Sequence, residues 1–136
     1  RELELQFNMS SLISIPMTNL TSLHLHYDTA PRYNEFLSSH THLRNLTVDN
    51  GSELDDQTLS KLSLLHTLHL SSPYGISDKS LSRLTCLTDL HISENYEITD
   101  KSLCLCTQLR SLTLFLVPHV SGTSFKHLPS LTYLYL

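Results

Sequence analysis

The chain of 136 residues has few of the residues from which cofactor and metal sites are built. It contains only three glycines, so it has no glycine-rich loop to surround a phosphate group. Its three cysteines, Cys86, Cys104 and Cys106, cannot all pair with one another, and they lack the spacing to histidine that is typical of a zinc site. We therefore expect no cofactor and no bound metal, and Cys106, which falls where other repeats have leucine, is expected to fill core volume.

Positive charge and long apolar segments are also scarce. Nine Lys and Arg residues stand against 13 Asp and Glu residues, which gives a formal net charge of −4. The basic residues are scattered along the sequence and do not form the stripe that is typical of a nucleic-acid binder. The strongest apolar run, Leu112 to Val117, is far too short to cross a membrane. The composition thus excludes nucleic acid and membrane insertion from the expected functions.

The sequence is dominated by the repeated pattern Leu-x-x-Leu-x-Leu, in which an aliphatic residue sometimes replaces the third leucine. The pattern begins at Leu20, Leu43, Leu65, Leu87, Leu109 and Leu131. Successive starts are 23, 22, 22, 22 and 22 residues apart, and a shortened copy, Leu3 and Leu5, opens the chain. One such unit cannot bury its own apolar face, so the period indicates a stacked solenoid. We expect residues 1–136 to form a single domain of about six to seven repeats, cut from a longer solenoid because both ends fall in mid-repeat.

Each repeat predicts one strand and one short helical turn. Alternating leucines are typical of a strand with one buried side, and equivalent strands 22 residues apart must run parallel in one sheet. Ser77 and Thr99, each followed by Asp, resemble helix N-caps. Asp78 and Asp100 would then lie in the first turn, where the helix dipole favours a negative charge.

These patterns resemble the leucine-rich repeat family, including Asn95 at the ninth position of its frame. The segment Ile98 to Leu103, Ile-Thr-Asp-Lys-Ser-Leu, is similar to the cysteine-containing repeats of F-box proteins, which select substrates for ubiquitin ligases. Asn95, Pro73 and Gly51 stand where those repeats often have cysteine, and bacterial repeats of invasion proteins and effectors are also similar in length. The resemblance implies an α/β right-handed horseshoe with a parallel sheet on its concave face and short helices or 3-10 turns on its convex face.

The resemblance also implies that the concave sheet binds another protein, which makes a protein-interaction scaffold the expected function. Two alternatives remain: the substrate-recognition region of an F-box ubiquitin ligase, and a fragment of an extracellular receptor or of a bacterial adhesion or effector protein. Four N-x-Ser/Thr sequons favour secretion, whereas the free thiols weakly favour an intracellular location, so localisation stays open. We expect a monomer.

Polar residues between the buried leucines should form the concave surface. The candidate partner-binding residues there are His24, His26, Asp49, His69, Asp89, His91, Phe115, Tyr133 and Tyr135. His69 and His91 would lie on neighbouring strands, with Asp89 beside them. These three side chains could supply part of a zinc site or respond to pH, but they could equally be polar residues tolerated on a sheet surface.

Aromatic residues gather on the last two expected strands. Together with a neighbouring leucine, they either anchor a partner or are covered by further repeats. These residues are Phe115, Leu116, Tyr133 and Tyr135. Tyr74 and Tyr96 occupy identical loop positions, and we expect Tyr74 and Tyr96 to stack along the rim.

Catalysis is not expected. His69, Ser71 and Asp89 could be chosen as a triad from the concave face. An open sheet, however, lacks the enclosed pocket and the oxyanion donors that nucleophilic chemistry requires.

Overall fold

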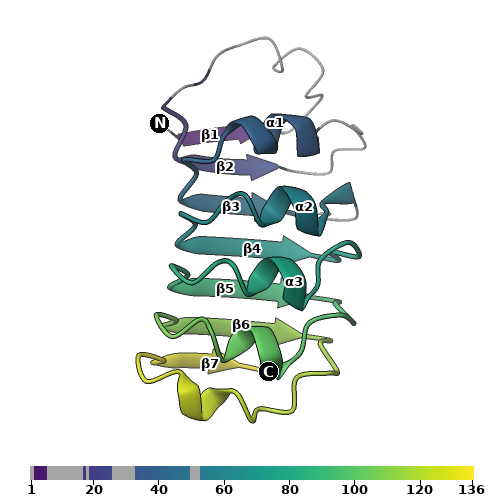
Figure 1. The fold of residues 1–136 in the computed structure, drawn as a ribbon, viewed down its shortest axis with the longest axis vertical. Coiled ribbons are helices and arrows are strands. Elements are labelled where there is room, and N and C mark those ends of the chain that lie inside the picture. The colour runs from purple at the N-terminus through teal and green to yellow at the C-terminus, as the bar shows by residue number, and fades with distance from the viewer. Residues whose placement is uncertain (1, 6–16, 18, 26–32, 50–52) are drawn as a thin grey trace.

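Seven parallel strands form one sheet in sequence order, as the computed structural model shows (Figure 1). The structure describes residues 2–5, 17, 19–25, 33–49 and 53–136. The strands are β1 (Glu2–Leu5), β2 (Ser22–Leu25), β3 (Asn45–Val48), β4 (Thr67–Ser71), β5 (Asp89–Ser93), β6 (Ser111–Phe115) and β7 (Tyr133–Tyr135). The predicted α/β solenoid with a parallel sheet is therefore confirmed.

Short helices cover one face of this sheet (Figure 1). They are α1 (Tyr33–Ser39), α2 (Asp56–Leu59), α3 (Asp78–Leu81), α4 (Asp100–Leu103) and the 3-10 helix η3 (Phe125–His127). The expected N-caps are confirmed, because Ser77 Oγ accepts a hydrogen bond from the Lys79 amide and Thr99 Oγ1 accepts one from the Lys101 amide, both at 3.2 Å. None of the helices in the described ranges is long and apolar enough to span a membrane.

The core lies between the sheet and the helices, and it consists mainly of the repeated leucines. The register stacks each leucine of the frame on its equivalent in the next strand, for example Leu46 on Leu68 and Leu68 on Leu90. Leu46, Leu68 and Leu90 are completely buried. The predicted core role of Cys106 is confirmed, since its side chain is also fully buried. Burial, followed by the neighbouring Cys104, raises the pKa of the Cys106 thiol to about 12, so this thiol stays protonated and unreactive.

An aspartate in each of α2, α3 and α4 joins its own helical turn to the next one. Asp78 accepts hydrogen bonds from the Thr99 amide at 2.8 Å, from Thr99 Oγ1 at 2.6 Å and from Ser102 Oγ at 2.5 Å. Asp56 bonds Ser77 and Ser80 of the next repeat in the same way, and Asp100 bonds Ser121 and Ser124. For Asp78 and Asp100, the sequence suggested only an interaction with the helix dipole. The solenoid adds a contact between repeats, because it places the next hydroxyl-bearing turn beside each aspartate.

Asn95 fixes the connection between β5 and α4. Its side chain is buried, and its Nδ2 donates to the carbonyl oxygens of Pro73 and Ile76, both at 2.9 Å. Its Oδ1 accepts from the amides of Glu97 at 3.0 Å and Ile98 at 2.8 Å. One side chain thus satisfies four backbone groups on two consecutive repeats, two of them in the loop after β4 and two in the loop after β5.

Candidate functional site

The strand register places the predicted surface residues in columns that cross the sheet. In the central column, each residue pairs with the equivalent residue of the next strand. From β1 to β7 this column consists of Glu4, His24, Thr47, His69, His91, Thr113 and Tyr135. Thr67, Asp89, Ser111 and Tyr133 occupy consecutive positions of the column before it. His26 lies outside the described residues. The remaining candidate residues share the sheet face that lies opposite the helices.

Two histidine–aspartate pairs form on this face. His24 Nε2 lies 3.2 Å from Asp49 Oδ1, and His69 Nε2 lies 3.2 Å from Asp89 Oδ1. Both pairs join neighbouring strands, so Asp89 contacts His69 of β4 although it lies two residues from His91 on its own strand. The rings of His69 and His91 are 5.7 Å apart at an interplanar angle of 52°. The structure thus brings His69, Asp89 and His91 together, as their spacing suggested.

The environment of His91 favours its neutral form. Burial lowers the pKa of His91, and the nearby His69 lowers it further, against the opposing effect of Asp89. The two imidazoles would repel each other if both were protonated. Lowering the pH therefore puts positive charge on this surface at an increasing electrostatic cost.

Ser71 and His69 lie two residues apart on β4. Within the described ranges, no hydrogen bond joins Ser71 to His69. The candidate triad of His69, Ser71 and Asp89 therefore has no hydrogen bond between nucleophile and base in this structure. No group of three or more His, Cys, Asp or Glu side chains that could hold a metal ion occurs in the same part of the chain.

Three aromatic rings lie at the C-terminal end of the same face. Phe115 of β6 is 48 % exposed, while Tyr133 and Tyr135 of β7 are 55 % and 53 % exposed. The register pairs Phe115 with Ser93 and Tyr135 with Thr113, so each ring continues a column that is polar on the preceding strands. Large, half-exposed rings on a rigid sheet are suited to burial against another protein.

Leu116 follows Phe115 in a conformation that leucine rarely adopts. Its φ of 54° places it in the left-handed region, and 55 % of the residue is exposed. The equivalent positions one and two repeats earlier hold Glu94 and Ser72, which share this backbone conformation and are joined by a hydrogen bond of 2.8 Å from Ser72 Oγ to Glu94 Oε2. Leu116 places an apolar side chain where the preceding repeats have polar ones.

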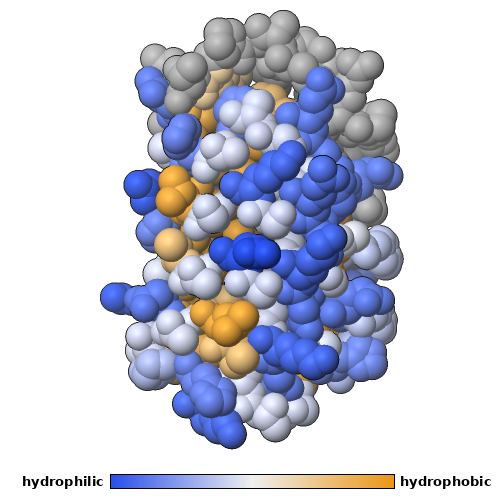
Figure 2. Space-filling model, in the orientation of Figure 1, coloured by the Kyte–Doolittle hydropathy of each residue, from blue (hydrophilic) through white to orange (hydrophobic). Residues whose placement is uncertain are grey.

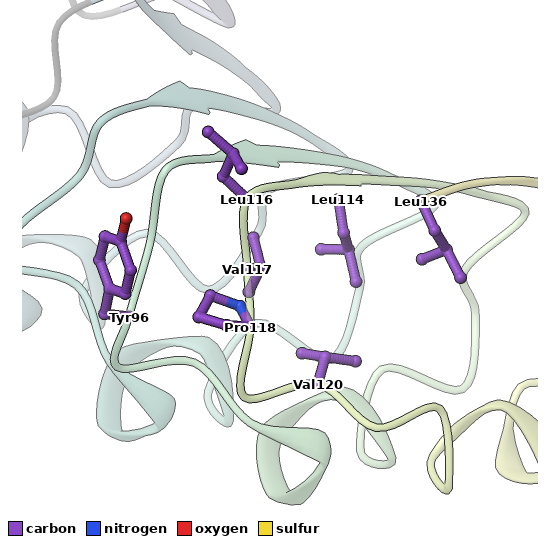
Figure 3. A pocket seen from close by; sticks show the side chains of 7 residues that line it. All are labelled: Tyr96, Leu114, Leu116, Val117, Pro118, Val120 and Leu136. Atoms are coloured by element: carbon purple, nitrogen blue, oxygen red, sulfur yellow. The ribbon is translucent and has the colours of Figure 1, made fainter.

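Leu116 also lines a hollow that the sequence did not reveal (Figure 3). This hollow has a volume of about 430 Å³. Its lining residues are Tyr96, Leu114, Leu116, Val117, Pro118, Val120 and Leu136. Figure 3 shows Leu114 of β6 and Leu136, which follows β7, directed toward Val120 in the loop. In the sequence, the apolar residues of the loop from Leu116 to Val120 are an indication of this hollow. Their side chains meet the other lining residues only in the folded repeat.

The expected stacking of Tyr74 and Tyr96 is wrong. Both tyrosines are exposed on their loops, at 66 % and 56 %, but no ring contact joins them in the described part of the structure. The two side chains project from successive repeats into solvent and do not pack along the stack.

Comparison with known proteins gives matches among solved structures. No family model and no curated protein matches the chain. The crystal structure of internalin C2 from Listeria monocytogenes matches with a TM-score of 0.71 and 23 % sequence identity, over 99 % of this chain and 60 % of the internalin. A second internalin of that species, inlF, matches with a TM-score of 0.55 and 17 % identity, over 99 % of this chain and 47 % of its own length.

The chain thus spans less than two thirds of either internalin. At these identities the similarity establishes the fold. The strand order, the helical turns on one face and the similarity to internalins together show that the chain folds as a right-handed leucine-rich repeat solenoid with a concave parallel sheet.

Proposed function

We propose that the chain is a protein-binding scaffold whose partner contacts the concave sheet. The observation that carries this proposal is the group of half-exposed rings on β6 and β7, Phe115, Tyr133 and Tyr135. Aromatic side chains of this kind lose little conformational entropy on binding and bury a large area, so they commonly dominate interface energetics. The histidine–aspartate pairs on β2 to β5 would add polar contacts that orient the partner.

Replacing Phe115 and Tyr135 with alanine should weaken partner binding by about 100-fold, because each ring is an interface anchor worth roughly 1–2 kcal/mol. Affinity capture with the intact chain would first identify the partner. Biolayer interferometry with the purified partner would then measure the dissociation constant. Tyr74→Ala is the matched control, since Tyr74 is an exposed ring on a loop away from the sheet face. Equal affinities of the double variant and the wild type would rule out the aromatic anchors.

The proposal includes no catalytic step. The missing hydrogen bond between Ser71 and His69 and the open sheet face both favour binding over hydrolysis. Incubation with ester and peptide substrates tests this, since turnover that disappears in His69→Gln would contradict a purely binding role.

A bacterial adhesion or effector role is a second candidate function, favoured over the F-box role by the similarity to two Listeria internalins. Under the F-box alternative, the same sheet would select substrates for a ubiquitin ligase. The sequence of the parent protein distinguishes these roles, because an F-box segment upstream would favour ligase recognition. A secretory leader would favour the adhesion role.

The histidines predict that partner binding depends on pH. Lowering the pH from about 7.5 to about 5.5 should weaken binding several-fold, because protonation of His69 and His91 adds mutually repelling charges to the interface. Because the pKa of His91 is lowered, the part of the affinity loss that comes from His91 should occur at a pH below the usual histidine range. Affinities measured at both pH values should differ for the wild type and agree for the His69→Gln/His91→Gln variant. Identical pH profiles for the two proteins would refute this role.

A further inference from the structure

The helix-bearing face gathers basic side chains that appear scattered in the sequence. Lys79 of α3 and Lys101 of α4 occupy equivalent positions one repeat apart. Arg83 follows α3, and Lys126 and His127 lie in η3, all of them exposed. Figure 2 shows this side of the molecule, where hydrophilic residues run along the helices and surround small hydrophobic patches. The 22-residue period therefore produces a basic surface that no continuous stretch of sequence contains.

Two of these cations line a hollow on this face. It has a volume of about 260 Å³. Its lining residues are Asp100, Lys101, Cys104, Thr123, Ser124, Lys126 and His127. Within the described part of the chain, neither Lys101 Nζ nor Lys126 Nζ has a hydrogen-bond or ion-pair partner. By contrast, Lys61 Nζ donates to Ser38 Oγ at 3.2 Å. Both ammonium groups of the hollow are therefore available to an outside ligand.

The carboxylate of Asp100, which lines this hollow, is already engaged. Asp100 Oδ2 accepts from the amide and hydroxyl of Ser121 at 2.8 and 2.7 Å. Asp100 Oδ1 accepts from the amide and hydroxyl of Ser124 at 2.9 and 2.6 Å. Burial alone would raise the pKa of Asp100, but these hydrogen bonds outweigh it and hold the pKa well below the usual range. The carboxylate is thus ionised and bound by four donors.

The cations of this part of the face are more exposed than its aspartates. Lys79, Arg83, Lys101 and Lys126 are exposed, whereas Asp56, Asp78 and Asp100 are partly buried and accept hydrogen bonds from the next repeat. Glu97, in the loop that leads to α4, adds one exposed negative charge. The exposed ammonium groups beside the hollow would attract an anionic segment to it.

We propose that this basic helix face is a second binding surface, which takes an acidic peptide segment of a partner protein. Ligand carboxylates would meet Lys101 and Lys126 across the hollow, with Lys79 and Arg83 continuing the surface along the stack. Leu105, which is 47 % exposed directly after α4, offers an apolar contact to a peptide side chain. His127 is the one aromatic ring among the lining residues of the hollow, so successive nucleic-acid bases would have no row of rings to stack on, which favours a peptide over RNA.

Fluorescence anisotropy with a labelled oligoglutamate peptide tests the proposal. The wild type should bind it at low salt and more weakly as salt increases, because exposed charge pairs are screened. At low salt, where screening is weak, Lys101→Gln/Lys126→Gln should weaken binding by about tenfold, since the variant loses two charged contacts with the peptide. Arg44→Gln/Arg110→Gln is the matched control, because it removes two exposed charges at the starts of β3 and β6 and should change affinity less than about twofold.

Three results would overturn the proposal: no peptide binding at low salt, equal losses in the two charge-matched variants, or binding of a single-stranded RNA or an anionic vesicle in place of the peptide. Unfolding curves of both variants verify that they fold. Phe115→Ala/Tyr135→Ala should bind the peptide as the wild type does, so failure of this proposal is distinguishable from failure of the concave-face proposal.

Discussion

Replacing Asn95 with alanine should lower the free energy of unfolding by about 3 kcal/mol, the largest effect we expect from a single polar substitution in this chain. The substitution removes four hydrogen bonds from a buried position. The carbonyl group of Ile76 and the amide of Ile98, both on buried residues, would lose the bond to Asn95, as would the amide of Glu97. The Pro73 carbonyl would keep the Ile76 amide, at 3.3 Å. Urea denaturation followed by circular dichroism measures the change.

Two controls separate the hydrogen bonds from the loss of side-chain volume. Asn95→Asp keeps the acceptor for the Glu97 and Ile98 amides but loses the donor to Pro73 and Ile76, so it should also be destabilised. Asn45→Ala changes an exposed asparagine of β3 and should leave stability within about 0.5 kcal/mol. An Asn95→Ala variant as stable as Asn45→Ala would show that this network contributes little.

Replacing Asp78 with alanine should lower the free energy of unfolding by about 2 kcal/mol. The variant loses three hydrogen bonds from Thr99 and Ser102, which join α3 to α4 across the repeat boundary. The effect should be smaller than that of Asn95, because the carboxylate is only partly buried and water can replace some of its contacts. Glu97→Ala, an exposed acidic residue of the same region, is the control.

The aspartates also predict how stability depends on pH. Burial would raise the pKa of Asp56 and Asp78, but hydrogen bonds from the next repeat outweigh it, so both pKa values lie below the ordinary 3.8. Asp100 is shifted in the same direction. A carboxylate with a lowered pKa in the folded state stabilises the fold above the pKa of the unfolded state, and this contribution is lost as the pH falls through the folded value. The wild type should therefore lose stability below about pH 4, and Asp78→Ala should show a shallower loss.

Much of the fold was predictable because one physical constraint recurs in every repeat. A strand buries alternate residues and a helical turn must cover them, so a leucine period of 22 residues determines the sheet, its parallel pairing and the buried set. Cys106 could be placed in the core for the same reason, because it occupies a leucine position. The N-caps at Ser77 and Thr99 were predictable from local hydrogen-bonding needs alone.

Contacts between repeats were less predictable. The period placed Asp89 near His69 and His91, but the choice of His69 as hydrogen-bond partner depends on the direction of each side chain. The expected stacking of Tyr74 and Tyr96 failed because equal positions in a loop do not imply that the rings face each other. The hollow beneath Leu116 arises from residues of three segments, so no single segment indicates it.

By itself, the sequence determined which residues are buried and which columns reach the concave surface, because the periods of strand and repeat act locally and identically in each unit. Only the tertiary structure decided what those residues contact. The bonds from Thr99 to Asp78, the two bonds from Asn95 to Pro73 and Ile76 and the gathering of Lys101 with Lys126 all cross from one repeat to another. Such contacts depend on the distance and orientation between stacked units, which are set by the packing of the leucine core and not by any one repeat.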